Sequence, residues 1–317
     1  MAPKNLGAQA KFKNQSLTTL LISYELFSVD GNYCLTCGSD KTVKLWNPHK
    51  ESGLLLKTYM GHGYEVLDAC GSSDNARIVS GGMDKQIIAW DVSTGKMLQK
   101  YRGHVGCVNA VTLNEDSSVA ISASLDGTVK AWDLRSKSRD PIQTLDEATD
   151  SVICVTANNT SIVSGSADGR VRRYDLREGQ MYADFVGKSV TSVNFTKDGQ
   201  CLLVSTLDST IRLLDKDTGE LLNDFNGHKN NEYKIDSCLI STDDYVISGS
   251  EDGKIYIWNL IEGKLALTLD NSIASAAFSR KPFHSLSSHP TKPCLLAANM
   301  DKIYLWKTKC DSDDEID

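Results

Sequence analysis

The sequence predicts an all-β protein whose seven blades, each of four antiparallel strands, form a propeller. The first observation is a repeat. The segment SASLDGTVKAWD at residues 122–133 recurs along the chain with an aromatic or apolar anchor residue near its end. Successive anchors lie 40 to 48 residues apart, which is the period of four-stranded propeller blades. The seven anchors are Trp46, Trp90, Trp132, Tyr174, Leu214, Trp258 and Trp306.

The second observation is the strand and turn pattern inside each repeat. A short apolar run such as SIVSGS (161–166) precedes an Asp-Gly or Asp-Lys turn, and a β-branched or aromatic run such as QIIAW (86–90) follows it. A further turn, such as DVSTG at 91–95, leads to the outer strand. The runs are nearly continuous in apolar character, which is typical of sheets covered on both faces by neighbouring blades.

Blades 1 and 7 carry the least regular repeats. Residues 15–28 should hold the inner strand of blade 1 but lack the Gly-His pair found elsewhere, and residues 271–284 lengthen the last repeat. We expect an N-terminal strand to complete blade 7, because closure removes free sheet edges. The predicted organisation is a flexible segment at 1–15, one seven-bladed domain at 16–308 and an acidic, disordered tail at 309–317.

Composition restricts the class of partner. The formal net charge of the 317 residues is −7 and the pI is about 5.4, which disfavours direct binding of nucleic acid. No run approaches the length of a membrane span, and the first residues lack the apolar core of a signal peptide. Nine cysteines, an odd number, fit a reducing compartment. We therefore expect a cytoplasmic and nuclear protein that does not bind membranes.

The Gly-His pairs at 61–62, 103–104 and 227–228, together with the Trp-Asp ends of several repeats, identify the chain as a member of the WD-repeat family. The resemblance implies a hydrogen-bonded chain in each complete blade, from histidine and turn aspartate to a strand serine and the tryptophan. The residues that match are His62, Ser80, Asp84 and Trp90; His104, Ser122, Asp126 and Trp132; and His228, Ser248, Asp252 and Trp258.

These Ser-His-Asp sets are expected to be structural. An enzyme needs one nucleophile with its base beside a pocket, whereas here the set repeats with the blade period. The sequence also has no phosphate-binding glycine loop and no HExxH motif. We therefore predict a non-enzymatic protein without catalytic residues, cofactor or metal.

Several longer blocks, among them GRVRRYDLR (169–177) and STLDSTIRLLDKDTGELL (205–222), resemble WD-repeat scaffolds that organise mitogen-activated protein kinase cascades and also occur with spliceosomes. This resemblance implies protein partners: kinase-cascade components, spliceosomal proteins and a prolyl hydroxylase of the hypoxia response. It further implies a monomer within larger complexes. The residues expected to contact partners on the narrow face are Tyr64, Met83, Cys107, Leu125, Tyr233 and Glu251.

Three further features have two interpretations each. Arg170, Arg172, Arg173 and Arg177 form either an ion-paired blade edge or a docking patch for an acidic partner. Ser312, which precedes three acidic residues, is either a phosphorylation site or part of an unmodified tail. The stretches WDLR (132–135) and YDLR (174–177) resemble the WDxR element of substrate receptors for cullin-4 ubiquitin ligases, which is the alternative function.

Overall fold

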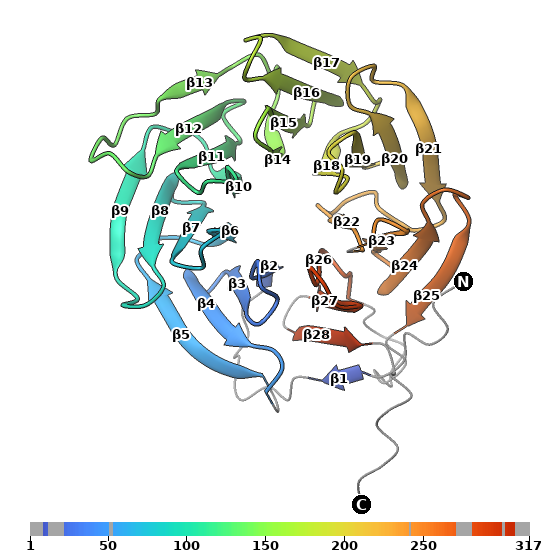
Figure 1. Ribbon diagram of the computed structural model, residues 1–317, viewed down its shortest axis with the longest axis horizontal. Coiled ribbons are helices and arrows are strands. Elements are labelled where there is room, and N and C mark those ends of the chain that lie inside the picture. Colours follow the sequence, from blue (N-terminus) through green and yellow to red (C-terminus); the bar gives the residue numbers. More distant parts are fainter. Residues whose placement is uncertain are drawn as a thin grey trace, which may run out of the picture.

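The computed structural model describes residues 9–11, 22–50, 53–240, 242–270, 281–299 and 302–307. In Figure 1 the strands form seven four-stranded antiparallel sheets around a central channel, which confirms the predicted propeller. No helix in the described ranges is long and apolar enough to cross a membrane.

Each blade runs from an inner strand at the channel to an outer strand at the rim. The first three blades consist of β2 (Ile22–Phe27), β3 (Cys34–Gly38), β4 (Thr42–Asn47) and β5 (Leu54–Met60); β6 (Val66–Gly71), β7 (Arg77–Gly82), β8 (Gln86–Asp91) and β9 (Met97–Arg102); and β10 (Val108–Leu113), β11 (Val119–Ser124), β12 (Val129–Asp133) and β13 (Gln143–Leu145).

The next three blades repeat this order. They consist of β14 (Val152–Ala157), β15 (Ser161–Ser166), β16 (Arg170–Asp175) and β17 (Met181–Phe185); β18 (Val190–Phe195), β19 (Cys201–Thr206), β20 (Thr210–Asp215) and β21 (Leu221–Asn226); and β22 (Ser237–Leu239), β23 (Tyr245–Gly249), β24 (Lys254–Asn259) and β25 (Leu265–Asp270).

Blade 7 is closed by the N-terminal part of the chain, as predicted. Its strands are β26 (Ser285–Ser288), β27 (Cys294–Asn299), β28 (Lys302–Lys307) and, at the rim, β1 (Gln9–Lys11). In the register of this pair Gln9 lies opposite Trp306. Because β1 lies within 1–15, the boundary predicted at residue 16 separates the closing strand from the domain to which it belongs. Residues 12–21 and 271–280 and the tail 309–317, with Ser312, lie outside the described residues.

The anchor residues hold neighbouring blades together. Trp132 of blade 3 is fully buried beside Tyr101 of blade 2, and Trp258 of blade 6 is buried beside Phe225 of blade 5. Trp90 and Tyr174 occupy the same place between blades 1 and 2 and between blades 3 and 4. An anchor residue recurs in every repeat because it fills the space between two sheets, where burial of apolar surface stabilises the fold.

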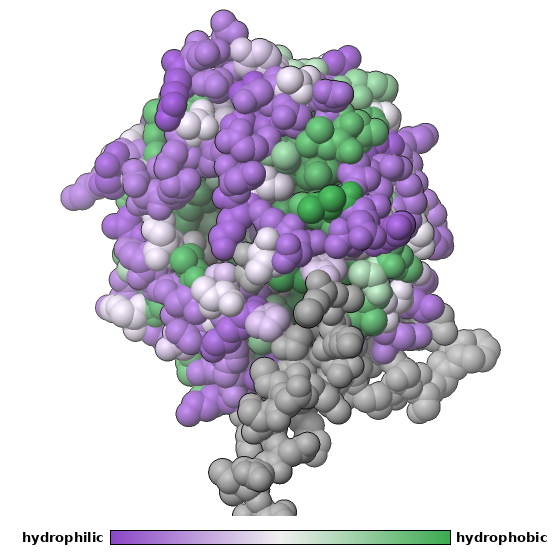
Figure 2. Space-filling view, turned by 45° about the vertical axis from the view of Figure 1, so that its right-hand side comes forward, coloured by the Kyte–Doolittle hydropathy of each residue, from purple (hydrophilic) through white to green (hydrophobic). Residues whose placement is uncertain are grey.

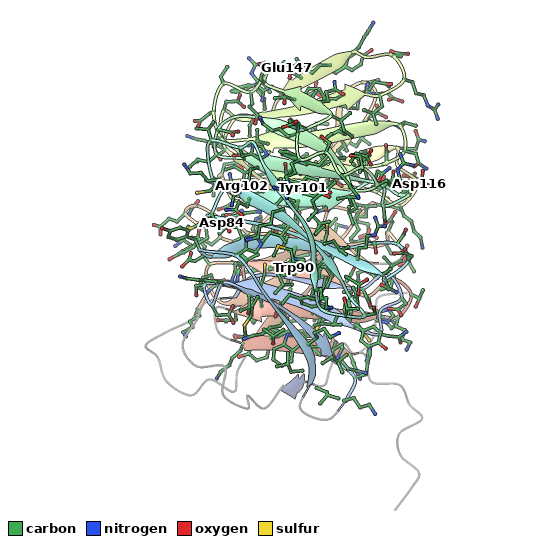
Figure 3. All side chains as sticks on the ribbon, turned by 90° about the vertical axis from the view of Figure 1, so that its left-hand side faces the viewer. Asp84, Trp90, Tyr101, Arg102, Asp116 and Glu147 are labelled. Carbon is green, nitrogen blue, oxygen red and sulfur yellow. The ribbon has the colours of Figure 1, made fainter. Side chains whose placement is uncertain are left out.

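Figure 3 gives an edge-on view in which Asp84 lies toward one face of the disc and Asp116 toward the other, with Trp90 and Tyr101 between them. We call the face with the Asp84 turn and the loops between blades the narrow face, and the opposite face the wide face.

Candidate functional site

In blades 1 to 6 the turn between the second and third strands carries an aspartate on the narrow face. In six blades this carboxylate accepts the backbone N–H two residues later at 3.0–3.2 Å. The residue after it takes positive φ: it is glycine in three blades and Lys41, Lys85 or Ser209 in the others. Aspartate side chains commonly stabilise turns by accepting the backbone N–H two residues later. All six aspartates therefore stabilise the turns in which they lie.

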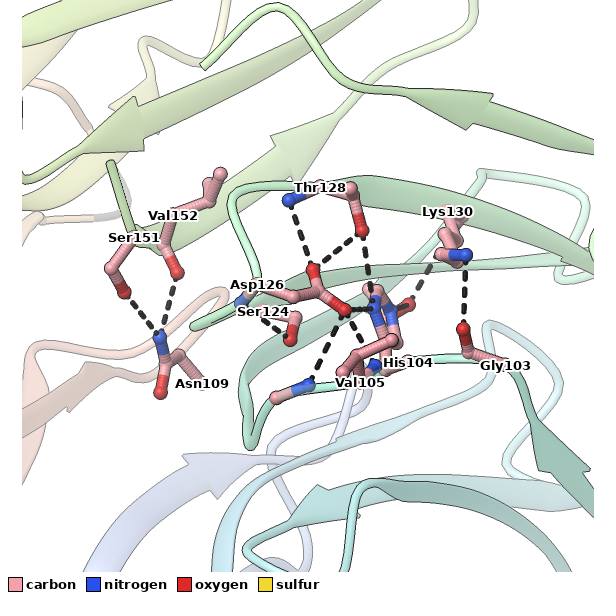
Figure 4. Close-up of polar contacts among 12 residues, drawn as sticks. Gly103, His104, Val105, Asn109, Ser124, Asp126, Thr128, Lys130, Ser151 and Val152 are labelled. Atoms are coloured by element: carbon pink, nitrogen blue, oxygen red, sulfur yellow. Dashed lines mark hydrogen bonds and ion pairs between the residues drawn. The ribbon is translucent and has the colours of Figure 1, made fainter. Parts of the chain in front are cut away.

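Blade 3 contains a complete hydrogen-bonded chain, and Figure 4 shows its contact between His104 and Asp126. The indole N–H of Trp132 donates to Ser122 Oγ at 2.9 Å, and Ser122 Oγ lies 2.7 Å from His104 Nε2. His104 Nδ1 lies 3.0 Å from Asp126 Oδ2. A neutral imidazole has one donor and one acceptor nitrogen, so it fits between the hydroxyl and the carboxylate. Blade 2 has the same chain, from Trp90 through Ser80 and His62 to Asp84.

The titration behaviour of this chain follows from burial and hydrogen bonding. Burial lowers the pKa of His104, although the neighbouring carboxylate opposes the effect. Burial would raise the pKa of Asp126, but bonds from Thr128, Val105 and His104 outweigh it and hold the pKa below its usual value. The hydrogen-bonded chain of blade 3 therefore pairs a neutral histidine with an ionised aspartate. Its histidine and serine are buried inside the fold and do not lie beside a pocket.

The third predicted chain, in blade 6, is not formed. Tyr256 donates its hydroxyl to Asp252 Oδ2 at 2.8 Å, and the indole of Trp258 donates to the carbonyl of Asn226 at 3.0 Å. His228 is buried beside Trp258, with neither ring nitrogen hydrogen-bonded, and burial lowers its pKa to about 4. The prediction for this blade is wrong because the tyrosine hydroxyl occupies the carboxylate.

Blades 1, 4 and 5 lack the histidine and use a basic residue instead, a feature that the sequence analysis missed. Four positions after the turn aspartate, a side-chain nitrogen lies 2.6–2.7 Å from the carboxylate in the pairs Asp40–Lys44, Asp168–Arg172 and Asp208–Arg212. The sequence contains the signal: these three blades lack the Gly-His histidine and carry Lys or Arg at this position. Arg172 is almost fully buried and also bonds Ser166 Oγ at 2.6 Å, so it is not a partner-binding residue.

The remaining arginines of blade 4 differ in exposure. Arg173 is buried between blades 4 and 5, where it lies 3.5 Å from Asp175, 3.7 Å from Asp217 and over the ring of Tyr182. It therefore belongs to an ion-paired blade contact rather than to a docking patch. Arg170 and Arg177 are exposed, and Arg170 lies over the ring of Phe185, which is itself 66% exposed.

Most of the predicted narrow-face residues are accessible. Tyr64, Met83, Leu125 and Tyr233 are exposed, with Tyr64 at 64% and Leu125 at 56%. Backbone and thiol contacts bring Met83 and Leu125 together around Cys107, which is half-buried. Tyr233 belongs to blade 6, on the other side of the channel.

Glu251 is occupied within the fold. Its side chain is 5% exposed and accepts the backbone N–H groups of Asn231, Glu232 and Tyr233. The prediction that Glu251 contacts a partner is therefore corrected: this carboxylate shapes the loop that presents Tyr233.

The rim also carries apolar residues. Figure 2 shows apolar surface between hydrophilic residues on the side of β21 and β25. Leu221, Leu222, Ile261 and Leu265 are exposed there. The molecule thus offers separate apolar areas on the rim and on the narrow face.

Comparison with known proteins agrees with this architecture. The family model described as "Nucleolar protein 10-like, N-terminal domain" matches residues 11–256. The chain is 55% identical to WD repeat domain-containing protein 83 of Homo sapiens over 281 residues, covering 89% of this chain and 86% of that protein. It is 34% identical to the homolog of that protein in Dictyostelium discoideum, with 92% and 95% covered. The chain therefore belongs to the WD-repeat β-propeller family.

Proposed function

We propose that the protein is a non-catalytic scaffold that binds several protein partners on different surfaces. The observation that carries the proposal is that the polar and the apolar residues of the narrow face differ in their availability to a partner. The turn aspartates are occupied by the protein's own hydrogen bonds, whereas Tyr64, Met83 and Leu125 between them are exposed. Exposed aromatic and apolar groups of this kind act as anchors in protein interfaces.

The partners that we propose are components of a mitogen-activated protein kinase cascade and proteins of pre-mRNA splicing complexes, with a prolyl hydroxylase as a further candidate. The sequence blocks at 169–177 and 205–222 support this assignment by their resemblance to scaffolds with such partners. We further propose that the protein acts as a monomer in the cytoplasm and the nucleus, since its partners would be found in both compartments.

Separate surfaces should bind separate partners. We expect Tyr64→Ala with Leu125→Ala to remove one set of partners, and Arg170→Glu with Phe185→Ala on the rim of blade 4 to remove another. Distant sites that share no moving element act nearly independently. The measurement is co-precipitation of kinase-cascade and splicing proteins with each double variant at matched melting temperature.

A matched control is Val29→Ala with Tyr33→Ala, which changes exposed residues of the β2–β3 turn on the wide face. This control should keep both sets of partners. Parallel loss of the same partners from the narrow-face and rim variants would show one composite site and contradict the scaffold proposal.

The alternative function, a substrate receptor of a cullin-4 ubiquitin ligase, is favoured by one observation. The side chain of Arg135 is 71% exposed, and its Nε lies 3.6 Å from Asp133, a contact that leaves most of the guanidinium open to solvent. Arg177 is exposed at the equivalent place in blade 4. An arginine presented in this way suits bidentate pairing with a carboxylate of an adaptor.

Affinity capture tests this alternative. If the receptor function holds, the ligase adaptor co-purifies with the wild-type protein and is lost with Arg135→Ala plus Arg177→Ala. The control, Lys137→Ala plus Arg139→Ala, removes two neighbouring exposed basic residues and should leave the adaptor bound. Absence of the adaptor from the wild-type capture would reject this function.

A further inference from the structure

The loop between β21 and β22, residues 227–236, is longer than the equivalent loops at 61–65 and 103–107. Contacts with blades 5 and 6 fix its central part. Besides the three backbone N–H groups held by Glu251, the N–H of Asn230 donates to Ser209 Oγ at 2.9 Å. Near the end of the loop Tyr233 is exposed, whereas the next residue, Lys234, lines a cavity in the central channel.

Lys234 reaches across this channel. Its Nζ donates to the backbone carbonyl of Asn109 in β10 at 3.2 Å, although the two residues are 125 positions apart. Blades 3 and 6 lie on opposite sides of the channel in Figure 1. The Asn109 side chain in turn bonds Ser151 and Val152 of blade 4, as Figure 4 shows. Lys234 therefore links the loop of blade 6 to the far wall of the propeller.

A cavity of about 230 Å³ in the channel is lined by Lys234 and by the carboxyl groups of Asp68, which is buried, and Asp236, which is partly buried. The Asp68 carboxylate accepts the backbone N–H groups of Ala69 and Val111 at 2.8 Å each. The two aspartates occupy equivalent positions of their repeats: Asp68 lies in β6, directly before the residue paired with Ser80, and Asp236 directly precedes Ser237, the residue paired with Ser248. Three other blades carry Ala110, Cys154 and Ser192 there, so the charges are a feature of blades 2 and 6.

Burial raises the pKa of both Asp68 and Asp236 to about 6, and the charge of Lys234 opposes this rise. The cavity is also lined by two thiols, Cys154 and Cys238, and burial raises the pKa of Cys154 to about 12. The lining residues from β2, β10, β18 and β26 are uncharged: Leu26, Ala110, Ser192, Val193, Asn194, Leu286, Ser287 and Ser288. The charge that faces Lys234 therefore changes when the two carboxyl groups titrate.

We propose that Lys234 is a clasp that holds the end of loop 227–236 across the channel while Asp68 and Asp236 are ionised, and that protonation of the two carboxyl groups releases it. Two carboxylates facing one ammonium keep the lysine in the cavity. Once they are neutral, the partly buried ammonium of Lys234 lacks a counter-charge in the cavity and is more stable in water. Tyr233 precedes Lys234, so release would move a residue of the narrow face. An effect of this movement on partner binding rests on the proposed function, whereas the release of Lys234 does not.

Hydrogen–deuterium exchange of the full-length protein tests the clasp without any partner. For the wild type we expect exchange of residues 232–236 to be about tenfold faster at pH 5.5 than at pH 7.5, after correction for the intrinsic pH dependence of exchange. Lys234→Met should give the fast exchange at both pH values, and Asp68→Asn with Asp236→Asn should do the same. Lys234→Arg keeps the charge and should retain the pH response.

The matched control is Lys229→Met, which removes a lysine of the same loop that pairs with Glu251 instead of entering the channel. It should leave the pH response unchanged. Equal protection of residues 232–236 at both pH values in the wild type would overturn the proposal, as would a pH response that survives in Lys234→Met. If Lys234→Met does not fold, the wild-type pH series and Lys234→Arg decide the question. If the Lys234→Met variant loses partners while exchange of residues 232–236 is unchanged, the clasp proposal is wrong and the proposed scaffold function still holds.

Discussion

Replacing Asp168 by alanine is expected to lower the free energy of unfolding by about 3–5 kcal/mol, the usual cost of leaving one ion of a buried pair without its partner. Arg172 Nη2 lies 2.6 Å from Asp168 Oδ2, and its Nη1 lies 3.2 Å from Oδ1. The side chain of Arg172 is 3% exposed and that of Asp168 is 10% exposed. In the variant, the guanidinium of Arg172 would therefore be left buried without a counter-charge and with little contact with water. Chemical denaturation of both proteins measures the difference.

The chain provides a matched control in the next blade. Asp208 and Arg212 form the same pair at 2.7 Å, but their side chains are more exposed, at 26% and 21%. Asp208→Ala should therefore cost clearly less than Asp168→Ala. The double variant Asp168→Ala with Arg172→Met should recover the part of the loss that comes from the unpaired guanidinium, because apolar residues can often replace a buried ion pair without loss of stability. Equal losses at the two aspartates would contradict the assignment.

The pH dependence of the Asp168 effect has a definite sign. Burial would raise the pKa of Asp168, but bonds from Arg172, Ser166 and Thr149 outweigh it and hold the pKa below the usual value of an aspartate. A carboxyl group with a lowered pKa in the folded state adds stability above its unfolded pKa and loses it on acidification. The difference between wild type and Asp168→Ala should therefore be full at neutral pH and shrink below about pH 4.

The sequence predicted the blades because the features that define them are local. The anchor tryptophans and the turn aspartates each depend on a few neighbouring residues, and the structure confirms both. The polar partner of each turn aspartate was less predictable, because several side chains compete for it. Tyr256 stands where blades 2 and 3 have Ile88 and Lys130, and its hydroxyl takes Asp252 although the histidine, serine and tryptophan are all present.

Contacts across the channel could not be predicted from the repeat. The bond from Lys234 to Asn109 joins residues 125 positions apart, and it depends on a loop that departs from the blade pattern. A signal was nevertheless present: Asp68 and Asp236 place charge at an inner-strand position that is uncharged in neighbouring blades. Burial likewise separated Arg172 and Arg173 from Arg170 and Arg177, which the sequence had grouped into one cluster.

The two buried histidines of blades 3 and 6 should respond oppositely to replacement. His104→Ala is expected to cost about 1–3 kcal/mol, because Ser122 and Asp126 lose hydrogen bonds inside the fold. His228→Leu should be neutral or stabilising at pH 7, since both nitrogens of His228 are buried without partners and an apolar side chain has none to satisfy. Thermal and chemical denaturation of both variants measure the contrast, and a loss at His228 as large as at His104 would contradict it.

Acid should amplify the difference at His228. Burial lowers its pKa to about 4 in the folded protein, whereas an unfolded histidine titrates near 6.5. The unfolded chain therefore binds the extra proton first, and this group destabilises the fold as the pH falls from about 6.5 to about 4, by an amount on the order of 3 kcal/mol. His228→Leu removes this titrating group. The free energy of unfolding of the variant should therefore exceed that of the wild type by a growing amount as the pH falls from about 6.5 to about 4. An advantage that stays constant with pH would mean that His228 has a hydrogen-bond partner in solution.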